Sequence, residues 1–314
     1  MEGILVAERQ REAGTKFAGC RKGMVINMKA WLIYDRDSAI YNEAYINFYI
    51  EEGSKLDIAV KLILVEELEF GVEMNHLFIR YQGKQIPNPD FAICRTIYPL
   101  LSRHLEMMGI KVFNNSHVSE ICNDKARTCQ YLARTGIRMV DTRFYRNALG
   151  RDALLKASKP AVMKAVDGHG GKQVFLYEAG KSNPDELDKI LQGVGKSDVV
   201  VQPLVGSRHQ DLRVYVIGKE IQAAVLRTAR EGFKSNYSLG GEVSLYSLSD
   251  QEISIVNTII SQFEFGLAGI DFIIGDDGEL IFNEIEDVVG SRMLYRCSDI
   301  NIVERYLRFI LEQL

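Results

Sequence analysis

The stretch from Gly269 to Arg292 reads GIDFIIGDDGELIFNEIEDVVGSR. It predicts two short apolar strands, Ile270–Ile274 and Glu279–Ile285, on either side of the turn Gly-Asp-Asp-Gly. An Asp-Gly pair between alternating apolar runs is a strong β-hairpin signal. Acidic side chains recur along this otherwise apolar hairpin, so we take it as the centre of the candidate site.

The register of the hairpin decides which acidic side chains meet. If Asp277-Gly278 forms a two-residue turn, Asp271 lies directly opposite Glu284. If the loop takes four residues, Asp271 faces Phe282 and Glu284 becomes its diagonal neighbour. In both registers Asp271, Glu284 and Glu286 lie on one face, because side chains alternate along a strand with a period of two.

Three carboxylates on one face favour a bound cation, because like charges that face each other across strands are destabilising. Hard oxygen ligands suit Mg²⁺ or Mn²⁺, and Mg²⁺ commonly binds together with substrate phosphates. The alternative is a solvated acidic face, since surface carboxylates are common. The sequence therefore predicts a divalent metal site at Asp271, Glu284 and Glu286.

The composition narrows the class of protein. A chain of 314 residues is long enough for more than one domain, and 46% hydrophobic with 25% charged residues is typical of a globular protein. A net charge of -4 gives no basic footprint, so we expect no nucleic-acid partner. No apolar run reaches the roughly 18 residues of a membrane span. Five scattered cysteines indicate reduced thiols in a cytoplasm.

Alternating strands and helices predict an α/β (α+β) fold with a mostly parallel sheet in its first unit. Residues 1–27 have no sustained apolar period and read as a poorly ordered extension, or as the product of an upstream start codon. A first domain is expected at 28–118. A second unit at 119–314 divides into a small lobe, about 119–200, and a large lobe, about 201–314. The absence of Gly-x-Gly-x-x-Gly after the first strand argues against a dinucleotide site there.

Individual elements follow from apolar periodicity and from Gly and Pro punctuation. In the first domain, strands are predicted at Lys29–Tyr34, Ile58–Val65, Leu77–Tyr81, Lys84–Ile86, Phe91–Cys94 and Ile110–Phe113, and helices at Asn42–Glu52, ended by Gly53, and Pro99–Met108, ended by Gly109. In the second unit, helices are predicted at Asp124–Thr135, 150–158, Asp185–Leu191, Asp250–Phe265 and Asn301–Leu311, and strands at Ala161–Val166, Val174–Tyr177, Val199–Val205, Asp211–Ile217 and Glu220–Thr228.

A glycine-rich loop, Gly168-His169-Gly170-Gly171, lies between two predicted strands and lacks the Gly-Lys-Ser/Thr ending of a Walker A loop. Glycines let backbone N–H groups approach a phosphate closely, although a plain hairpin turn is the alternative. Lys164 lies within the apolar strand VMKAV, where an unpaired lysine would be costly. An anionic ligand would explain it. We read His169 as a loop residue rather than as a base.

Polar residues also interrupt the later strands. Pro203 breaks the apolar run Val199–Val205 and frees backbone groups that an adenine edge could use, although alone this pattern is an edge strand. Asp211 and Arg213 share a strand face, and Arg227 lies late in the next apolar strand. With the strand lysine, these two arginines look like a clamp for a polyphosphate near the carboxylates.

Taken in order, NDK opening a helix, VMKAVDGHGGKQVFLYE, VQPLVGSRHQDLR, AAVLRTAREGFKSN and the GIDF…FNEIE hairpin resemble the ATP-grasp superfamily. The likeness is strongest to RimK-type carboxylate–amine ligases and covers roughly Pro89 to Arg292. It implies a Rossmann-like pre-ATP-grasp domain followed by a two-lobed ATP-grasp fold. It also implies an enzyme that joins a carboxylate and an amine as an amide. ATP would activate the carboxylate as an acyl phosphate.

The resemblance also implies roles for single residues. Two lysines, Arg227 and a polar loop would bind ATP phosphates. From the residues themselves, Arg213 is a further candidate for nucleotide binding, and Arg227 and Arg292 are the catalytic candidates. The nucleotide would contact Lys125, Lys164, the hinge Gln202, Pro203 and Leu204, the ribose ligand Asp211, and Lys234, Ser235 and Asn236. Two Mg²⁺ ions (or Mn²⁺) would bind to Asp271, Glu284 and Glu286.

This chain departs from the family pattern at the end of the hairpin. The family has Glu-x-Asn followed by a Pro-Gly turn, whereas here Glu284-Ile285-Glu286 follows Asn283. Either Asn283 or Glu286 could complete the metal site, and we favour Glu286 because Asn283 is expected to point to the opposite face. Residues 287–292 are altered where the acceptor is expected to bind. Arg292 is the candidate for holding the substrate carboxylate, and a surface arginine is the alternative.

The expected function is an ATP-dependent ligase that adds an amino acid to a carboxylate acceptor. Its partners would be ATP, a small-molecule or peptide carboxylate and an amino-acid amine, without a membrane. Apolar edge strands of the first domain could support a homodimer. Two alternatives remain: a nucleotide-binding regulatory protein without turnover, and a phosphotransferase on the same scaffold, because fold alone does not fix chemistry.

Overall fold

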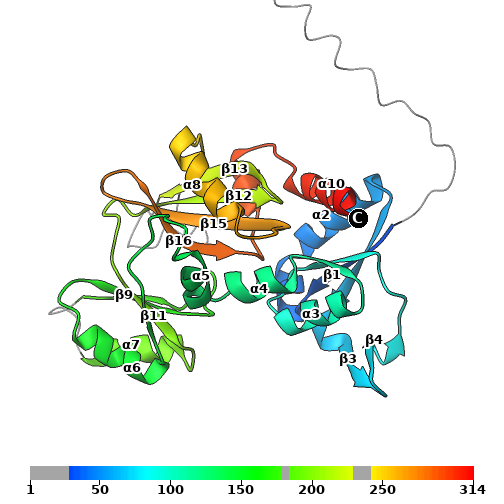
Figure 1. Ribbon diagram of the computed structural model, residues 1–314, viewed down its shortest axis with the longest axis horizontal. Helices are drawn as coiled ribbons and strands as arrows, with labels where there is room; N and C mark the ends of the chain where they lie inside the picture. The colour runs from blue at the N-terminus through cyan, green and yellow to red at the C-terminus, as the bar shows by residue number, and fades with distance from the viewer. Residues whose placement is uncertain (1–27, 179–183, 229–241) are drawn as a thin grey trace, which may run out of the picture.

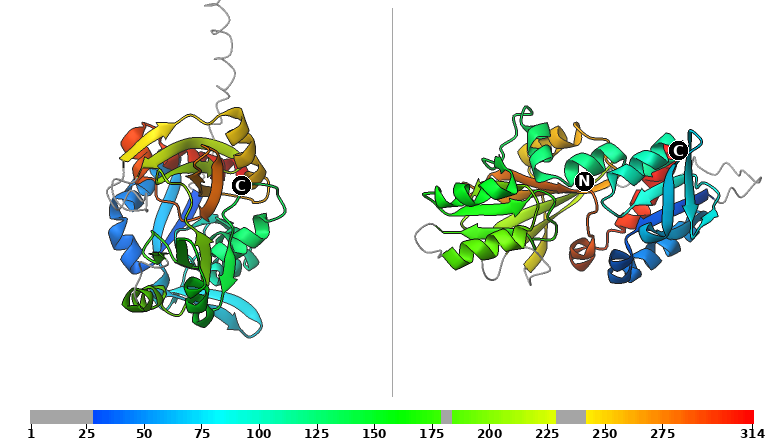
Figure 2. Two further views of the ribbon diagram at one scale, coloured as in Figure 1. Left: turned by 90° about the vertical axis from the view of Figure 1, so that its left-hand side faces the viewer. Right: turned by 90° about the horizontal axis from the view of Figure 1, so that it is seen from below.

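The computed structural model describes residues 28–178, 184–228 and 242–314. Its strands form four sheets, and the three larger ones each define one part of the molecule. Figures 1 and 2 show the first domain and the small lobe at opposite ends, with the large lobe joining them. The extension expected at residues 1–27 lies outside the described residues.

The first domain is built on a parallel sheet with strand order β2-β1-β6-β7. Apolar runs make these strands because a parallel sheet is covered on both faces by helices. The strands are β1 (Met28–Tyr34), β2 (Ile58–Leu64), β6 (Phe91–Cys94) and β7 (Lys111–Phe113), and the helices are α1 (Arg36–Tyr41), α2 (Glu43–Lys55) and α3 (Pro99–Met107). The predicted α/β pattern of this region is confirmed.

The sequence suggested that Gly53 ends the preceding helix, and that prediction is wrong. The helix α2 continues through Gly53 to Lys55. A Cβ atom at this position would lie 2.6 Å from Cγ2 of Val60 on β2. The glycine therefore allows the helix to approach the sheet closely, which is a packing role rather than a helix stop.

A second, antiparallel sheet projects from the first domain (Figure 1). It contains β3 (Leu68–Glu73), β4 (His76–Tyr81) and β5 (Lys84–Gln85). The β4–β5 hairpin was predicted from Gln82-Gly83, and both residues have positive φ. The strand β3 was not predicted, because Glu residues interrupt its apolar pattern.

Two short helices lead from the first domain into the second unit. They are α4 (Ser116–Cys122), which crosses the boundary expected at residue 119, and α5 (Lys125–Leu132). Asp124 caps α5, because its Oδ1 accepts hydrogen bonds from the amides of Ala126 and Arg127 at 2.9 and 3.0 Å. This cap fixes the start of α5 between the two lobes.

The small lobe is a four-stranded sheet with order β10-β9-β11-β8. Two helices cover it and share its core of Leu154, Met163, Leu187 and Val199. Its elements are β8 (Arg143–Tyr145), α6 (Asn147–Leu155), β9 (Ala161–Ala165), β10 (Val174–Tyr177), α7 (Pro184–Val194) and β11 (Val199–Pro203).

The large lobe is a five-stranded antiparallel sheet with order β14-β13-β12-β15-β16. The helix α8 covers one face and begins with a capping box between Ser249 and Glu252. The elements are β12 (Gln210–Ile217), β13 (Glu220–Thr228), β14 (Glu242–Tyr246), α8 (Asp250–Ile260), β15 (Leu267–Ile274), β16 (Leu280–Glu286), α9 (Arg292–Cys297) and α10 (Ile302–Gln313).

The first domain and the large lobe share one hydrophobic core. Tyr49 of α2 packs in the same cluster as Tyr215 of β12, Val289 and Leu307 of α10. Figure 1 shows α10 beside α2. The first domain therefore sits against the face of the large lobe that carries the loop after β16.

Candidate active site

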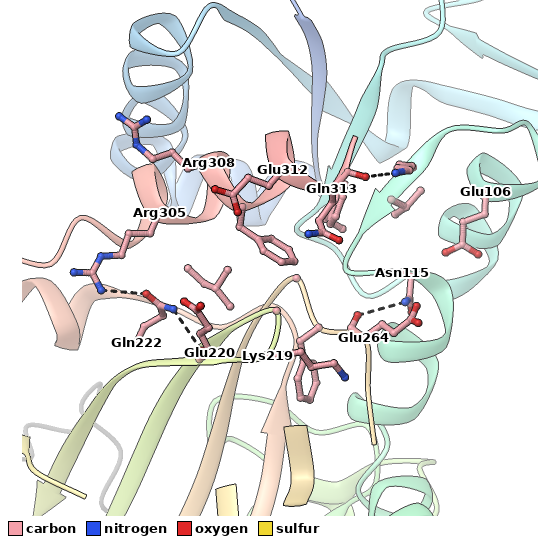
Figure 3. A pocket seen from close by; sticks show the side chains of 18 of the residues that line it. Glu106, Asn115, Lys219, Glu220, Gln222, Glu264, Arg305, Arg308, Glu312 and Gln313 are labelled. Atoms are coloured by element: carbon pink, nitrogen blue, oxygen red, sulfur yellow. Dashed lines mark hydrogen bonds between the residues drawn. The ribbon is translucent and has the colours of Figure 1, made fainter. Parts of the chain in front are cut away.

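Two clefts of the described residues are candidates for the site. The larger, of 1060 Å³, lies between α10, β7 and the β12–β13 turn, and Figure 3 shows its rim of mixed charge, including Glu220, Arg305 and Glu312. None of the sequence-predicted site residues that the structure describes lines it. The smaller, of 110 Å³, lies between the small and large lobes, and we call it the interlobe cleft.

Most of the predicted nucleotide-binding residues meet in the interlobe cleft. Its walls come from β9, β10 and β11 on one side and from β12, β15 and β16 on the other. The predicted residues that line it are Lys125, Lys164, Gln202, Pro203, Leu204, Asp211 and Glu284. The other lining residues are Val140, Val162, Gly171, Val174, Val205, Gly206, His209, Gln210, Ile273 and Asn283. Apart from Gly171 and Asn283, the sequence analysis gave this second group no binding role.

The adenine hinge predicted at 202–204 forms the end of β11. The side chain of Gln202 is buried and donates from Nε2 to Oγ1 of Thr142 at 2.9 Å. The Leu204 amide donates to the Pro160 carbonyl at 3.1 Å, so this amide is used within the small lobe. The neighbouring valines of the cleft provide the apolar walls that suit a planar base.

Lys164 on β9 is buried and points across the cleft to the large lobe. Its Nζ donates to Oδ1 of Asn283 on β16 at 2.8 Å. Burial lowers the pKa of Lys164 to about 8, and the nearby Glu284 carboxylate opposes this shift. An anionic ligand would stabilise the protonated form of this buried amine.

Lys125 joins three parts of the site. Its Nζ donates to the carbonyl of Gly168 in the glycine-rich loop and forms an ion pair with Oε2 of Glu284 at 3.2 Å. Gly170 and Gly171 adopt positive φ in the same loop, a conformation that favours glycine. Burial lowers the pKa of His169 beside them.

The hairpin of β15 and β16 has a register that neither predicted turn gives. The loop takes residues 275–279, and Phe272 pairs with Phe282. A register shift then follows, so that Asp271 pairs with Glu284. The pairing of Asp271 with Glu284 is confirmed, but it arises from a β-bulge rather than from a two-residue turn.

The bulge also corrects the prediction for Asn283. Strict alternation would place the side chains of Asn283 and Glu284 on opposite faces of the hairpin, and that prediction is wrong. The bulge inserts Asn283 as the extra residue, so that Asn283 and Glu284 both line the interlobe cleft. Phe282 and Ile285 on either side lie in the core beneath.

Asp271, Glu284 and Glu286 gather as the sequence predicted. Each can offer one carboxylate oxygen such that these atoms lie within 4.8 Å of one another. Burial raises the pKa of Glu286, and Arg213 offsets only part of this shift. For Glu284, burial also acts to raise the pKa, but the charges of Lys125 and Lys164 outweigh it and the net shift is downward. This donor set fits a hard divalent cation.

Two buried arginines hold Asp271. Arg213 donates from Nε and Nη2 to its two oxygens at 2.7 Å each, and Arg227 donates from Nη2 at 2.7 Å. Burial acts to raise the pKa of Asp271, but these guanidinium groups outweigh it and lower the pKa. Arg213 also pairs with Glu286 at 2.9 Å. The two arginines therefore lie beside the carboxylates, as the predicted clamp requires.

Asp211 lines the cleft and pairs with Arg227 through Oδ1. Burial raises its pKa to about 6, although Arg227 opposes the shift. The carboxylate predicted to hold a ribose is therefore already bound to the arginine predicted to contact phosphates. A nucleotide would enter this existing network of ion pairs.

Arg292 lies outside the interlobe cleft. Its side chain is exposed, and Nη2 donates to the Tyr41 carbonyl and to Oδ1 of Asn42 at 3.1 and 3.2 Å. The guanidinium lies 4.1 Å from the centre of the Tyr41 ring. The structure thus places Arg292 against α1 and α2 of the first domain, and its predicted contact with a substrate carboxylate stays a prediction.

Arg95 is a further candidate, which was not predicted from the sequence. This buried residue follows β6 and donates from Nη2 to the Val289 carbonyl at 2.9 Å. Val289 belongs to the loop that follows the carboxylate strand β16. A charged residue directly after a buried parallel strand is the signal that could have identified it, since ligands of such sheets bind beyond the carboxyl ends of the strands.

The predicted phosphate contacts Lys234, Ser235 and Asn236 lie outside the described residues. Within the described parts of the chain, no helix is long and apolar enough to cross a membrane. The fold and the site together define an ATP-grasp enzyme: in the cleft between two lobes, Lys164 of the small-lobe sheet meets Asn283, and Lys125 of α5 meets Glu284, both on the large-lobe sheet.

Comparisons with known proteins agree with this class. The chain belongs to the RimK-like ATP-grasp family, whose model matches residues 122–310. It is 31% identical to a probable alpha-L-glutamate ligase of Legionella pneumophila (strain Corby) over 238 residues, which cover 73% of this chain and 78% of the relative. It is 29% identical to the ribosomal protein bS6–L-glutamate ligase of Escherichia coli O81 (strain ED1a), over 74% and 80% of the two chains.

A solved structure with the same fold is the ATP-grasp ligase PsnB with a phosphomimetic variant of its minimal precursor, Mg and ADP. The TM-score is 0.66 at 16% identity, over 92% of this chain and 99% of the other. The protein is accordingly an ATP-dependent ligase that forms C–N bonds, and ATP and Mg²⁺ are its expected nucleotide and metal.

Proposed function

We propose that this protein joins the amine of an amino acid, L-glutamate in the first instance, to a carboxylate of a peptide or small-molecule acceptor. The observation that carries this proposal is the cluster of Asp271, Glu284 and Glu286, of which Glu284 lines the interlobe cleft together with Lys125 and Lys164. The names of the glutamate ligases among its relatives support L-glutamate as the amine.

In this proposal different residues of the interlobe cleft bind the phosphates, the base and the ribose of the nucleotide. Lys125, Lys164 and Arg227 bind phosphate oxygens, and Lys234, Ser235 and Asn236 add further contacts. Gln202, Pro203 and Leu204 border the base, and Asp211 the ribose. Arg213 orients Asp271 through its two hydrogen bonds. We also propose that the chain divides at about residues 119 and 201 into a first domain, a small lobe and a large lobe. The nucleotide contacts then come from the small and large lobes.

Asp271, Glu284 and Glu286 would hold two Mg²⁺ ions, or Mn²⁺, in this proposal. When bound, these ions neutralise charge on the phosphate oxygens and orient the phosphoryl group. Asn283 lies in the same cleft and could replace Glu286 as the third ligand. The lysines and arginines supply the remaining positive charge, which is the main protein contribution to phosphoryl transfer.

The proposed reaction has two steps. A carboxylate oxygen of the acceptor attacks the γ-phosphorus of ATP, the bond from that phosphorus to the bridging oxygen breaks, and ADP leaves. The amine nitrogen then attacks the acyl carbon, and the bond from that carbon to the phosphate oxygen breaks. Phosphate leaves with the former carboxylate oxygen and with the proton that the amine loses. Positioning of the reactants accounts for much of the acceleration.

The experiment that tests this function measures ADP and phosphate release with Mg-ATP and a panel of amino acids and acids, singly and in pairs, with mass spectrometry of the products. Release of both products with a new amide mass supports the ligase. ADP without free phosphate, together with a phosphorylated product, would instead establish the phosphotransferase. Nucleotide binding without turnover, even with cell extract as acceptor, would establish the regulatory protein.

Two further expectations belong to this proposal. The exposed edge of the first domain could support a homodimer, which light scattering would detect. The four cysteines that the structure describes are free thiols, which is consistent with a reducing cytoplasm.

A further inference from the structure

Arg95 is a buried arginine with an unusual set of partners. It is 6% exposed, and among the described residues no carboxylate forms a salt bridge with it; the buried Asp287 carboxylate, which begins the loop after β16, interacts with its charge over a longer distance. Arg213 and Arg227, which are buried to a similar degree, both pair with carboxylates. A buried charge without a paired opposite charge is costly. The position of Arg95 therefore calls for an explanation.

The contacts of Arg95 connect the first domain to one loop of the large lobe. Its Nη2 donates to the Val289 carbonyl at 2.9 Å, and its Nε donates to the Tyr34 hydroxyl at 3.3 Å. The guanidinium lies 5.5 Å from the centre of the Tyr45 ring. The Tyr45 hydroxyl in turn lies 3.0 Å from Oγ of Ser291. We call residues 287–291 the post-strand loop.

The post-strand loop is tightly coupled to the carboxylate strands. It begins directly after Glu286, and the Tyr215 hydroxyl donates to the Gly290 carbonyl at 2.9 Å. A Cβ atom at Gly269 would come within 2.6 Å of Cγ2 of Val289, and Gly269 pairs with Glu286. A displacement of Val289 would therefore be transmitted to the strand pair that holds Asp271 and Glu286.

The side from which a second substrate can reach the carboxylates follows from this geometry. The small lobe and the interlobe cleft occupy one side of β16, where Lys164 and Lys125 contact Asn283 and Glu284. The post-strand loop and the first domain border the other side. If the nucleotide fills the interlobe cleft, this second side is the one left for the substrate that meets the phosphoryl group.

We propose that Arg95 is a positioning residue for the carboxylate-bearing acceptor: by holding the Val289 carbonyl, it fixes the post-strand loop against which the acceptor binds. Arg95 acts through Val289 rather than by touching the reacting atoms. This inference rests on the ligase function proposed above.

The test compares Arg95→Met, Arg95→Lys and the control Arg103→Met. Arg103 is an exposed arginine of the same domain, with a single ion-pair contact of 3.9 Å to Glu106. Steady-state rates are measured with Mg-ATP and the acid–amine pair that turns over fastest in the panel. We expect Arg95→Met to raise the KM for the acid by about 10-fold or more and to change the KM for ATP by less than about 2-fold. Arg95→Lys should lie between, because it keeps the charge but loses the planar fork.

A second measurement does not depend on turnover. Amide hydrogen exchange is compared in the wild type and the variants with Mg-ADP present, for the post-strand loop and for α5. We expect Arg95→Met to accelerate exchange at residues 288–291 and to leave residues 126–132 unchanged.

The outcomes separate the two proposals. Unchanged exchange in the post-strand loop, or an equal rise of the KM values for ATP and the acid, would overturn the role of Arg95. A wild-type protein without turnover on any pair would contradict the ligase function, whereas the exchange result would still decide whether Arg95 fixes the loop.

Discussion

Lys164 and Asn283 are joined by a hydrogen bond of 2.8 Å across the interlobe cleft, although they belong to different sheets. The β-bulge after Phe282 turns Asn283 toward the cleft and so makes this contact available. The small and large lobes are therefore connected at the position where a nucleotide phosphate would bind. The contact has a direct consequence for pH dependence.

The affinity for Mg-ATP should fall as the pH rises above about 8. Burial lowers the pKa of Lys164 to about 8, so the free protein loses this charge in mildly alkaline solution. A phosphate favours the protonated amine, and nucleotide binding should therefore take up a proton in this range. Isothermal titration calorimetry in buffers of different ionisation enthalpy measures that uptake.

The matched control is the variant Lys164→Arg, because a guanidinium keeps its charge at every pH of this experiment. The affinity of Lys164→Arg for Mg-ATP should stay level over the range of about 2 pH units in which the lysine loses its charge. An affinity of the wild type that does not change with pH would refute this account.

The linkage between Lys164 and folding has the opposite sense. The folded pKa of Lys164 lies below that of the unfolded chain, so the unfolded state binds more protons between the two values. The stability of the wild type should therefore rise with pH above about 8, relative to that of Lys164→Arg. Urea unfolding of the two proteins without nucleotide, at a series of pH values, measures this difference.

Glu284→Gln should abolish ADP formation while the protein remains folded. Glutamine keeps the shape of the side chain but removes the charge that pairs with Lys125 at 3.2 Å and that the proposed metal site needs. We expect the rate of ADP release to fall on the order of 100-fold or more. The control is Glu279→Gln, an exposed glutamate just before β16, which should keep its activity. Full activity of Glu284→Gln would show that Glu284 is not a metal ligand.

Asp271→Asn should destabilise the protein even without nucleotide or metal. Arg213 and Arg227 would each lose their buried ion pair with Asp271 and keep only a second carboxylate, Glu286 and Asp211 respectively. Breaking a buried ion pair costs about 3–5 kcal/mol. Urea unfolding followed by fluorescence measures this change in the free energy of unfolding. Asp277→Asn, in the exposed turn of the same hairpin, is the control and should unfold close to the wild type.

The same carboxylate sets a pH dependence in acid. The folded pKa of Asp271 is lowered, so its contribution to stability is present above the pKa of the unfolded chain, about 3.9. It is lost as the pH falls through the lower folded pKa. The difference in stability between the wild type and Asp271→Asn should therefore shrink in acid. A difference that is constant with pH would contradict the role of the two arginines.

Gly269→Ala should affect the acceptor more than the nucleotide. The added methyl group would come within 2.6 Å of Val289 and 3.3 Å of Cδ of Arg213, so the post-strand loop has to move. We expect a KM for the acid that rises by about 10-fold, with a KM for ATP that changes by less than about 2-fold. Gly71→Ala is the control, because its nearest neighbour, Phe78, lies at an ordinary 3.4 Å. Wild-type kinetics for Gly269→Ala would show that the loop tolerates the displacement.

The sequence was most informative where one local rule decides the structure. Alternation placed Asp271, Glu284 and Glu286 on one face, and the structure gathers them within 4.8 Å. A helix was predicted to begin at Asp124, and the side chain of Asp124 caps α5. These features depend on neighbours in the chain, so they can be predicted without knowledge of the tertiary fold.

Features that depend on distant contacts could not be predicted in this way. No residue near Asn283 signals a bulge, because the shift compensates the loop of residues 275–279 at the far end of the hairpin. Gly53 resembles a helix stop, yet its role is close packing against Val60. The hydrogen bond from Arg95 to the Val289 carbonyl joins residues 194 positions apart, and no local pattern contains that information.

In the proposed reaction the acceptor carboxylate takes the γ-phosphoryl group of ATP before the amine attacks. The most direct measurement uses an acceptor labelled with oxygen-18 in its carboxylate, with Mg-ATP and the amine, followed by mass spectrometry of the phosphate. The account predicts phosphate that carries one oxygen-18 atom for each amide formed. Unlabelled phosphate, released while the amide forms, would contradict it.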